Sequence, residues 1–290
     1  MPELPEVESF RRIAHRVAVG RRIELVLGVT DGLEHPLTAG DPIVLEDEAE
    51  APGSLARALV GKWVIGTSRR GKYAWLELEG ELALVFHFGM SGQLRAPDAA
   101  PLVLSSSPKV PELSFPPRFT RLLLRFSDGG ALAYADGRRL GRVWLEGDPA
   151  SSTRLAKLGF DAATELPGRD ELVELVSRRR GAVKALLLDQ TFAAGVGNWI
   201  ADEVLYQARI DPRRDVVSLS RKEILALRRS IRAVLDTAIS VDADSTKYPP
   251  SWLFHHRWGK ASGAKTARGE KVEFIEVGGR TTAWVPARQR

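Results

Sequence analysis

A proline and a glutamate directly follow the initiator methionine, and together they could carry nucleophilic chemistry. If Met1 is removed, Pro2 becomes a free secondary amine, and with an α-amino pKa near ~8 a usable fraction is unprotonated at neutral pH. Attack of this amine on the aldehyde carbon of a sugar gives a charged iminium, an electron sink that acidifies the neighbouring C2′ protons and favours β-elimination. Glu3 could act as the general acid. The alternative is that Pro2 only begins a helix.

A glycine-rich turn predicts a site for an anion. Gly195, Gly197 and Asn198 lie between two helical segments, and such a turn exposes backbone N–H groups at the start of the second helix. A phosphate would suit these donors, and the Asn198 side chain could add more. A plain turn between two helices is the alternative interpretation.

Two short stretches could fill a gap in a stack of bases. Residues 89–92, Gly-Met-Ser-Gly, would turn tightly and present Met90 outward as an apolar wedge. Residues 136–140, Asp-Gly-Arg-Arg-Leu, place the basic Arg138 beside the apolar Leu140. A methionine folded into the core and a solvated arginine pair are the corresponding alternatives.

Isolated basic residues and histidines are less informative. Lys72 begins a strand after two arginines, and Arg280 follows two glycines at the tip of a predicted hairpin; each alone is typical of a surface charge. The chain has no cysteine, which excludes disulfides and thiolate metal sites. The five histidines do not have metal-ligand spacing, and the pair His255 and His256 would point in two directions on a strand. We predict no metal site and no cofactor.

Length, composition and charge indicate a folded chain of about two domains with a polyanionic partner. Of the 290 residues 44% are apolar and 27% charged, which allows a substantial core in each domain. No run of ~18 apolar residues could span a bilayer and the N-terminus lacks a secretory pattern, so we expect a soluble intracellular protein. Residues 1–150 carry a net charge of −2 and the remainder +7. This asymmetry fits nucleic acid, with ordinary solvated surface charge as the alternative.

The first half has the pattern of a short helix followed by a β-sandwich or barrel. Apolar residues recur at helical spacing over 7–17, and Gly20 can end that helix. Alternation over 23–29 predicts a strand with one shared face formed by Ile23, Leu25, Leu27 and Val29. Further strands are predicted at 63–68, 72–78, 82–88, 120–127, 131–135 and 142–146. Residues 96–118, rich in proline and serine, are predicted to form a long loop.

The second half changes to a helical period. Residues 147–168 have no clear pattern and are predicted to be a linker with a short turn of helix. Helices are predicted at about 169–178, 182–190, 199–208 and 221–240, the last one opened by the capping-box spacing of Ser220 and Glu223. Residues 271–275 and 281–285 are predicted to pair as a terminal hairpin.

Six separated motifs resemble the formamidopyrimidine-DNA glycosylase and endonuclease VIII family of base-excision-repair enzymes. They occur in the family's order, as MPELPEVE, RRGKYAWLEL, FHFGMSG, DGRRLG, LLLDQTFAAGVGNWIADEVLYQARIDP and GGRTTAWVP. The resemblance spans nearly the whole chain, and the start PELPEVE favours the formamidopyrimidine branch. It implies an α+β fold with an N-terminal β-sandwich catalytic domain carrying an N-terminal helix over 1–146 and a linker over 147–168. A helix–two-turn–helix DNA-binding domain over 169–245 and a finger made of a β-hairpin over 246–290 would follow.

The resemblance also implies roles for individual residues. Pro2 corresponds to the Schiff-base nucleophile and Glu3 to the essential acid. Lys72 corresponds to the proton donor and phosphate contact used during β-elimination, and Arg280 to the finger arginine that holds the backbone near the lesion and assists δ-elimination. The residues matched to DNA binding are Met90, Arg138 and Leu140, which fill the void left by the extruded nucleotide, Asn198, which grips phosphate, and the basic contacts Arg179 and Lys184.

Three features depart from the bacterial pattern. The bacterial finger binds zinc through four cysteines, which are absent here, and Val285 lies where one would be expected. The hairpin is therefore similar to the zincless finger of plant and fungal members, which share the stretches VDADS, FH and GGRTTA. Leu140 replaces a void-filling aromatic residue. Residues 241–260 do not resemble the loop that covers flipped 8-oxoguanine, so formamidopyrimidines and further-oxidised guanines are the expected lesions, with 8-oxoguanine left open.

The sequence thus predicts a bifunctional DNA glycosylase and AP lyase that removes oxidised purines through a Schiff base on Pro2, followed by β,δ-elimination. Its expected partner is damaged double-stranded DNA, bound by a monomer with no membrane involved, in the cytoplasm or nucleoid of a bacterium or the nucleus of a eukaryote. Two alternatives stay open: an endonuclease VIII-like glycosylase for oxidised pyrimidines, and a non-catalytic DNA-damage-binding protein.

Overall fold

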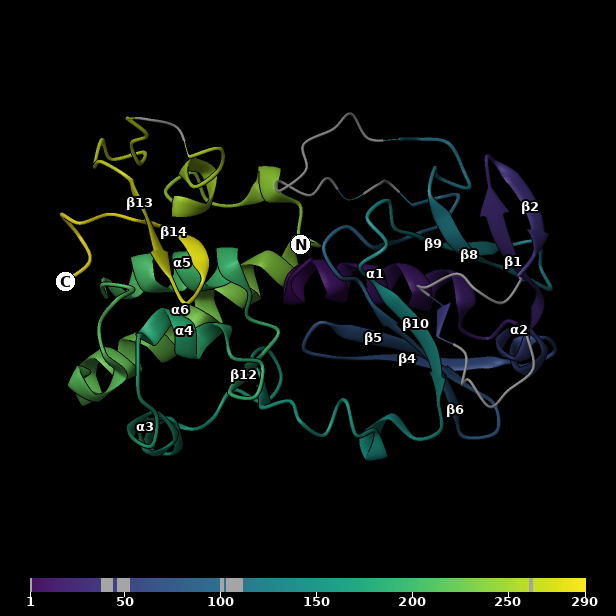
Figure 1. Ribbon diagram of the computed structural model, residues 1–290, viewed down its shortest axis with the longest axis horizontal. Coiled ribbons are helices and arrows are strands. Elements are labelled where there is room, and N and C mark those ends of the chain that lie inside the picture. The colour runs from purple at the N-terminus through teal and green to yellow at the C-terminus, as the bar shows by residue number, and fades with distance from the viewer. Residues whose placement is uncertain (1, 38–43, 46–52, 100–101, 103–111, 261–262) are drawn as a thin grey trace. The chain divides into compact units, whose positions relative to one another are not determined.

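The computed structural model describes residues 2–37, 44–45, 53–99, 102, 112–260 and 263–290, shown in Figure 1. The chain divides into two compact units, Met1–Ala156 (unit 1) and Lys157–Arg290 (unit 2). Most of the loop predicted at 96–118 lies outside the described residues, because these omit 100–101 and 103–111.

Unit 1 begins with helix α1 (Leu4–Ala18), which an acidic first turn and an early proline favour. Its apolar stripe includes Leu4, Val7 and Phe10, which are fully buried. The Phe10 ring lies 4.9 Å from the ring of Phe88, between their centroids. The helix contacts strands of both sheets of the unit. Burial of this stripe therefore fixes the start of the chain against the sheet core.

In the described part of unit 1, two five-stranded sheets follow α1, with α2 (Ser54–Leu59) beside them. One has the order β2 (Leu33–Pro36), β1 (Ile23–Thr30), β8 (Thr120–Phe126), β9 (Ala131–Ala135), β7 (Gln93–Arg95). The other has the order β3 (Val44–Leu45), β10 (Arg142–Glu146), β6 (Leu82–His87), β5 (Tyr73–Leu78), β4 (Val64–Arg70). All pairs are antiparallel except β3 with β10. Apolar residues from α1 and both sheets form one core, as expected of a sandwich.

The shared face predicted for residues 23–29 is wrong. Ile23 and Val26 point into the main core, Leu25 is half exposed, and Leu27 and Val29 pack on the outer face of the sheet. The register of β1 against β8 shifts between Ile23 and Leu25. A β-bulge adds one residue to a strand and so exchanges its two faces from that point on.

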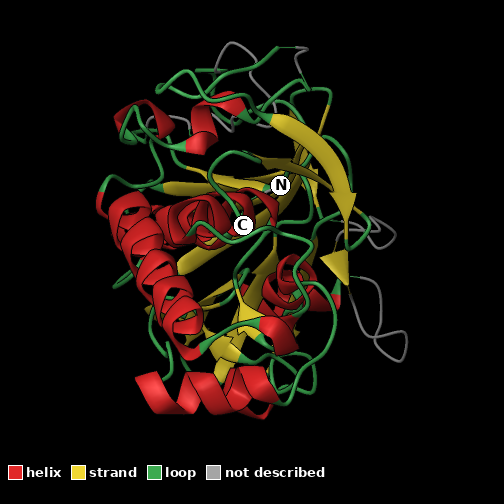
Figure 2. Cartoon of the chain, turned by 90° about the vertical axis from the view of Figure 1, so that its left-hand side faces the viewer, coloured by secondary structure: helices red, strands yellow, loops and turns green. Residues whose placement is uncertain are grey.

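Unit 2 is mainly helical; Figure 2 draws the helices of the chain in red. Its helices are α3 (Arg169–Ser177), α4 (Val183–Leu188), α5 (Asn198–Ala208) and α6 (Arg221–Ser240), and its short parallel pair is β11 (Phe160–Asp161) with β12 (Ala193–Ala194). Helix α6 contacts both α3 and α5. Its N-cap Ser220 accepts the Glu223 N–H, and the Glu223 carboxylate accepts the Ser220 N–H, as the capping-box spacing predicted. None of the helices in the described ranges combines the length and apolar character needed to cross a membrane.

The chain ends in the hairpin of β13 (Glu273–Val277) and β14 (Arg280–Trp284), at positions close to those predicted. Gly278 and Gly279 join the strands with φ of 60° and 68°, a left-handed turn that glycine adopts without steric cost. The strand predicted to hold His255 and His256 is wrong, because both lie in the 3-10 helix η4 (Leu253–His256). Three more 3-10 helices are η1 (Pro149–Ser151), η2 (Val216–Ser218) and η3 (Ser245–Lys247). The predicted α+β fold is confirmed.

Candidate functional site

Helix α1 places Pro2 and Glu3 at its N-terminal end. Both residues are buried, and Glu3 is the N-cap. The Glu6 carboxyl group accepts the backbone N–H of Glu3 at 3.0 Å. Burial, reinforced by the nearby Glu3 charge, raises the pKa of Glu6 to about 8. Glu6 is therefore a mainly neutral acid at pH 7, and it fixes the backbone of Glu3 while adding little negative charge.

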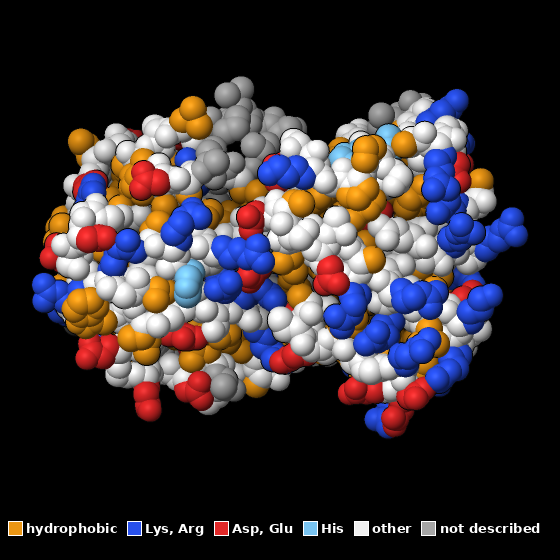
Figure 3. Space-filling view, turned by 180° about the vertical axis from the view of Figure 1, so that it is seen from behind, with side chains coloured by type: hydrophobic (Ala, Val, Ile, Leu, Met, Phe, Trp, Pro, Cys, Tyr) orange, Lys and Arg blue, Asp and Glu red, His pale blue; other side chains and the backbone are white. Residues whose placement is uncertain are grey.

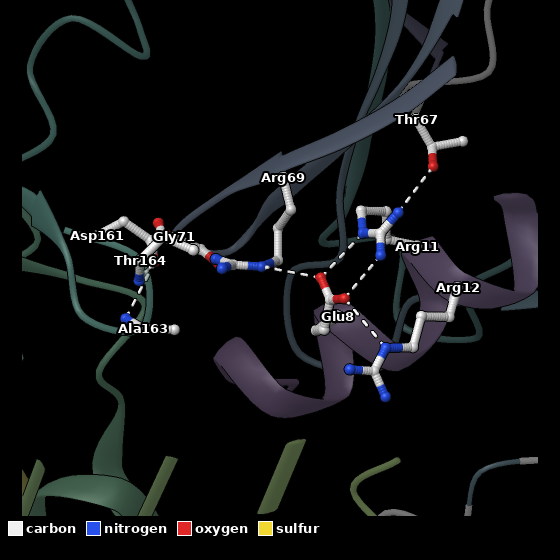
Figure 4. A network of polar contacts seen from close by, with 9 residues as sticks. All are labelled: Glu8, Arg11, Arg12, Thr67, Arg69, Gly71, Asp161, Ala163 and Thr164. Carbon is white, nitrogen blue, oxygen red and sulfur yellow. Dashed lines mark hydrogen bonds and ion pairs between the residues drawn. The ribbon is translucent and has the colours of Figure 1, made fainter. Parts of the chain in front are cut away.

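The turn between β4 and β5 carries Lys72. This turn is tied to α1 by Arg69, which donates from Nη1 to the Gly71 carbonyl at 3.1 Å and from Nε to the Glu8 carboxylate at 3.4 Å. Figure 4 shows Glu8 at the centre of this network. Because Glu8 belongs to α1, two ion-paired residues connect the helix that begins near Pro2 with the turn that holds Lys72.

Two further arginines from α1 complete the network around Glu8. Arg11 donates to the Glu8 carboxylate at 2.7 and 2.9 Å and to the Thr67 hydroxyl of β4 at 3.0 Å, and Arg12 donates to Glu8 at 3.1 Å. Burial by itself would raise the pKa of Glu8, but the hydrogen bonds and charges of the surrounding arginines lower it. The carboxylate therefore stays ionised and keeps several positive groups in fixed positions.

His87 lies close to Lys72 and was missed by the sequence analysis as a site residue. It pairs with Tyr73 across β5 and β6, with the two ring centroids 4.8 Å apart. Burial, with the positive charges of Lys72 and Arg142, lowers the pKa of His87 to about 4. The imidazole is therefore neutral at pH 7 and does not compete with Lys72 for an anion.

A buried carboxylate joins the two stretches predicted to fill a gap. Asp136 accepts the Ser91 hydroxyl at 2.5 Å and the backbone N–H groups of Arg138, Leu140 and Gly141 at 3.1, 3.0 and 2.8 Å. The loop 89–92 and the loop 136–141 are thus held by one side chain.

The two loops also touch through their backbones. A Cβ on Gly89, whose φ is 53°, would come within 2.4 Å of the Leu140 carbonyl, so only glycine permits this approach. Met90 is partly exposed, whereas Arg138 and Leu140 are exposed. The structure therefore brings the three residues predicted to fill the void onto two adjoining loops.

In unit 2, Asn198 begins α5, directly after the glycine turn. Its side-chain Nδ2 donates to the Thr281 carbonyl of β14 at 3.0 Å. Within the part of the chain that the structure describes, its Oδ1 is buried without a hydrogen-bond donor. The helix start is therefore joined to the finger hairpin one residue from Arg280, which is exposed at the hairpin tip.

The prediction that Lys184 contacts DNA directly is wrong, because its side chain is fully buried. Its Nζ donates to the Asp202 carboxylate at 2.6 Å and to the Thr282 hydroxyl at 2.7 Å. Asp202 also accepts the Arg257 guanidinium at 2.8 Å and the Ala283 N–H at 3.1 Å. A buried charge needs such partners, and here they join α4, α5 and the finger.

The finger is also held by apolar packing. Val285, where a cysteine was expected, is buried with Tyr206, Leu253, Val272 and Ala283. No group of three metal-ligating side chains occurs among the residues with described positions.

Arg179 lies at a cavity of about 500 Å³ lined by residues of unit 2. Its guanidinium carbon is 5.6 Å from the centroid of the Phe192 ring, and one of its nitrogens is 4.0 Å from the Asp189 carboxylate. The side chain is partly exposed. The Arg179 side chain is therefore accessible to a phosphate, whereas the side chain of Lys184 is not.

Positive charge gathers on unit 2. Residues 157–290 carry 23 Lys and Arg against 17 Asp and Glu, whereas residues 1–156 carry 19 against 20. Figure 3 shows Lys and Arg side chains crowded over unit 2, at the right of that view. A basic surface of this kind attracts a polyanion.

Sequence reasoning missed the side chains that position the site. Asp136 could have been found from its place directly before Gly137, because an aspartate at such a position is typical of an Asx turn. Asp202 stands inside an apolar helical stretch, a pattern that indicates a buried acid. Arg69 gave no such signal, because its partners Glu8 and Gly71 are identified only by the packing of α1 on β4.

Three family models match the chain. The formamidopyrimidine-DNA glycosylase N-terminal domain matches residues 1–143, the H2TH domain of the same glycosylase matches 158–249, and the formamidopyrimidine-DNA glycosylase-like C-terminal domain matches 252–286. A formamidopyrimidine-DNA glycosylase of Arabidopsis thaliana is 38% identical over 290 residues, covering 100% of this chain and 71% of that protein.

Solved structures of a bacterial glycosylase are also similar. The Lactococcus lactis formamidopyrimidine-DNA glycosylase bound non-covalently to DNA containing an AP site is 29% identical with a TM-score of 0.78, covering 99% of both chains. The wild-type enzyme of the same organism in complex with DNA containing an oxidised pyrimidine is 28% identical with a TM-score of 0.78, covering 100% of both chains.

Proposed function

The chain belongs to the formamidopyrimidine-DNA glycosylase family, and from this premise we propose that it excises oxidised purines through a Schiff base on Pro2. It is a DNA glycosylase of base excision repair whose partner is damaged double-stranded DNA. The observation that carries the proposal is the position of Pro2 and Glu3 at the start of α1, tied through Glu8 and Arg69 to the turn of Lys72.

In the proposed reaction the Pro2 nitrogen forms a bond to C1′ of the damaged nucleotide. The glycosidic bond breaks, and its electron pair leaves with the base. Glu3 supplies a proton to the departing base or to the ring oxygen of the sugar, and the proton that the Pro2 nitrogen releases goes to the other of these two atoms. The ring opens, and the product is an iminium that joins the protein to C1′. The sugar carbon cannot be attacked inside the stack, so the nucleotide is first extruded at a cost of a few kcal/mol.

Strand cleavage then follows by two eliminations. The iminium withdraws electrons and solvent water takes a C2′ proton. The electron pair of that C–H bond forms a double bond between C2′ and C3′, and the 3′ phosphate departs with its bonding pair. Lys72 serves as the proton donor and contact to phosphate in this step. A second elimination expels the 5′ phosphate, with Arg280 stabilising the developing negative charge. Water hydrolyses the remaining iminium and returns Pro2 as a free amine.

We also propose the lesion class for this reaction. Formamidopyrimidines and further-oxidised guanines are the proposed substrates, and oxidised pyrimidines are the second candidate, since a similar solved enzyme holds DNA with an oxidised pyrimidine. A panel of duplexes that each carry one lesion opposite each normal base separates these classes. We propose that the enzyme works where chromosomal DNA is held, the nucleoid of a bacterium or the nucleus of a eukaryote.

The substitution Pro2→Gly tests the nucleophile, because it leaves a primary amine in place of the secondary one. With borohydride and DNA containing an abasic site, we expect at least tenfold less trapped protein–DNA adduct than with the wild type. The affinity of Pro2→Gly for DNA with a tetrahydrofuran site, which has no aldehyde, should stay within twofold of the wild-type affinity.

Three other results would count against the proposal. Undiminished trapping by Pro2→Gly would exclude Pro2 as the nucleophile. An active wild-type preparation whose mass shows a retained or acetylated Met1 would exclude a free imino terminus. Damage-specific binding by the wild type without any trapping would indicate a non-catalytic binder.

A further inference from the structure

Phe119 is a large apolar residue held on the surface of unit 1 in an unfavourable backbone conformation. Its side chain is 46% exposed and its φ is 64°. The left-handed region is sterically costly for any residue with a bulky side chain, whereas glycine adopts it freely. Backbone strain of this kind persists where surrounding structure imposes it, and it gathers at functional sites.

The Phe119 ring lies against the loop 136–141. A Cβ on Gly137 would come within 3.2 Å of the Phe119 ring, and the Asp136 N–H donates to the Phe119 carbonyl at 3.0 Å. Arg138 directly follows Gly137. The aromatic ring and the loop that holds Arg138 and Leu140 therefore form one continuous surface.

The chemistry of this surface suits an unpaired base next to a phosphate. The Arg118 guanidinium carbon lies 4.7 Å from the centroid of the Phe119 ring, and both side chains are exposed. An arginine beside an aromatic ring combines a stacking face with a positive charge. Leu140, also 46% exposed, is apolar but has no aromatic face. Phe119 supplies the face that Leu140 lacks.

We propose that Phe119 stacks on the base that loses its partner when the damaged nucleotide is extruded. This inference rests on the proposed function, because it requires that the loop 136–141 enters the void. Stacking on one base would strengthen binding to a duplex with an unpaired base and leave binding to an intact duplex unchanged. Phe119 is in this account a DNA-binding residue that selects for the extruded state, and it takes no part in the bond changes.

Two variants at this position test the proposal. Phe119→Leu keeps an apolar side chain without a π face, and Phe119→Gly removes the ring together with the backbone strain. The probes are a duplex with a tetrahydrofuran site opposite 2-aminopurine and the same duplex undamaged. Leu33→Ala is the matched control, since Leu33 is an exposed apolar residue of β2 in the same unit.

For both Phe119 variants we expect about tenfold weaker binding to the tetrahydrofuran duplex, as for the loss of one stacked base. Quenching of 2-aminopurine should fall, and affinity for the undamaged duplex should stay within twofold. Phe119→Gly should also unfold at a higher urea concentration than the wild type, because glycine relieves the backbone strain at this position. Its weaker binding would then not come from a damaged fold. Leu33→Ala should match the wild type in both binding measurements.

Unchanged affinity and quenching in both Phe119 variants would overturn the inference, and so would an equal loss for damaged and undamaged duplexes. Borohydride trapping at saturating enzyme distinguishes this failure from failure of the proposed function. Wild-type protein that traps abasic DNA while the Phe119 variants bind normally would refute only the stacking role. Absence of trapping in the wild type would refute the nucleophile assignment itself.

Discussion

Asp136 is the residue on which the geometry of the two adjoining loops depends. Its carboxylate accepts four hydrogen bonds from loops 89–92 and 136–141 and is almost fully buried. A carboxylate only accepts hydrogen bonds. The NH2 group of an amide in its place would face the N–H donors of the loop, and two donors cannot form a hydrogen bond.

We therefore expect Asp136→Asn to lower the free energy of unfolding by ~1–3 kcal/mol, the cost of unsatisfied buried polar groups. It should also weaken binding to an abasic-site duplex. Ser91→Ala removes only one of the four hydrogen bonds, so it should lower the free energy of unfolding and the affinity for DNA by less. Urea unfolding and equilibrium binding are the assays, and equal losses for the two variants would contradict this account.

Glu6 makes stability depend on pH. Its pKa is raised from 4.5 to about 8, so between these pH values the folded chain keeps a proton that the unfolded chain has released. The contribution of Glu6 to the free energy of unfolding is therefore fully present below pH 4.5, and it is lost as the pH rises toward 8. Glu6→Gln has no proton to lose.

The difference in unfolding free energy between wild type and Glu6→Gln should therefore shift in favour of the variant from pH 5 to pH 8. Urea unfolding at both pH values measures it. A difference that does not change with pH would show that Glu6 titrates normally.

Among the elements, α1 and the turn between β4 and β5 must keep a fixed relation if Pro2 and Lys72 are to act on one nucleotide. Arg69 spans them, whereas Arg12 contacts Glu8 from within α1. Small misplacement of reacting groups can lower a rate by ~100-fold.

We expect Arg69→Gln to reduce the single-turnover excision rate at least tenfold while affinity for the tetrahydrofuran duplex stays within twofold. Arg12→Gln removes a Glu8 partner without separating the two elements, and its rate should stay within twofold of the wild type. Similar rates for the two variants would mean that the link between elements does not matter.

The finger hairpin is held to α4 and α5 by a buried ion-pair network around Asp202. Lys184→Met would leave Asp202 with one fewer buried cation, a change that typically costs ~3–5 kcal/mol. Lys271→Met removes a cation of the exposed pair with Glu273 on the same finger and should cost ~0–1 kcal/mol. Thermal or urea unfolding compares them, and equal effects would argue against a structural role for Lys184.

Over the whole molecule, the charge is divided so that unit 2 carries the excess of basic residues. Neutralised phosphates release counterions, so affinity for an abasic-site duplex should fall steeply between ~50 and ~200 mM salt. Arg280→Ala should reduce the slope of log affinity against log salt by ~1. Arg125→Ala, whose side chain pairs with Glu34 in unit 1, should leave it unchanged. A flat response in the wild type would contradict a basic DNA-binding surface.

Local signals account for what the sequence could predict. Alternation, helical periodicity and the capping pair Ser220 and Glu223 act between near neighbours, so element types and most boundaries follow from them. The motifs predicted the family, which is confirmed. The roles of Pro2, Glu3 and Lys72 remain predictions for the experiments above.

The sequence by itself determined most of the long helices and strands, the family and the set of residues available for chemistry. Only the tertiary structure decided which of these are accessible and which hold others in place. It buried Lys184 against Asp202, moved Leu25 out of the core through a bulge, and set Phe119 on the loop of Arg138. The physical reason is that burial, ion pairing and backbone strain depend on contacts between residues far apart in the chain, which no local pattern encodes.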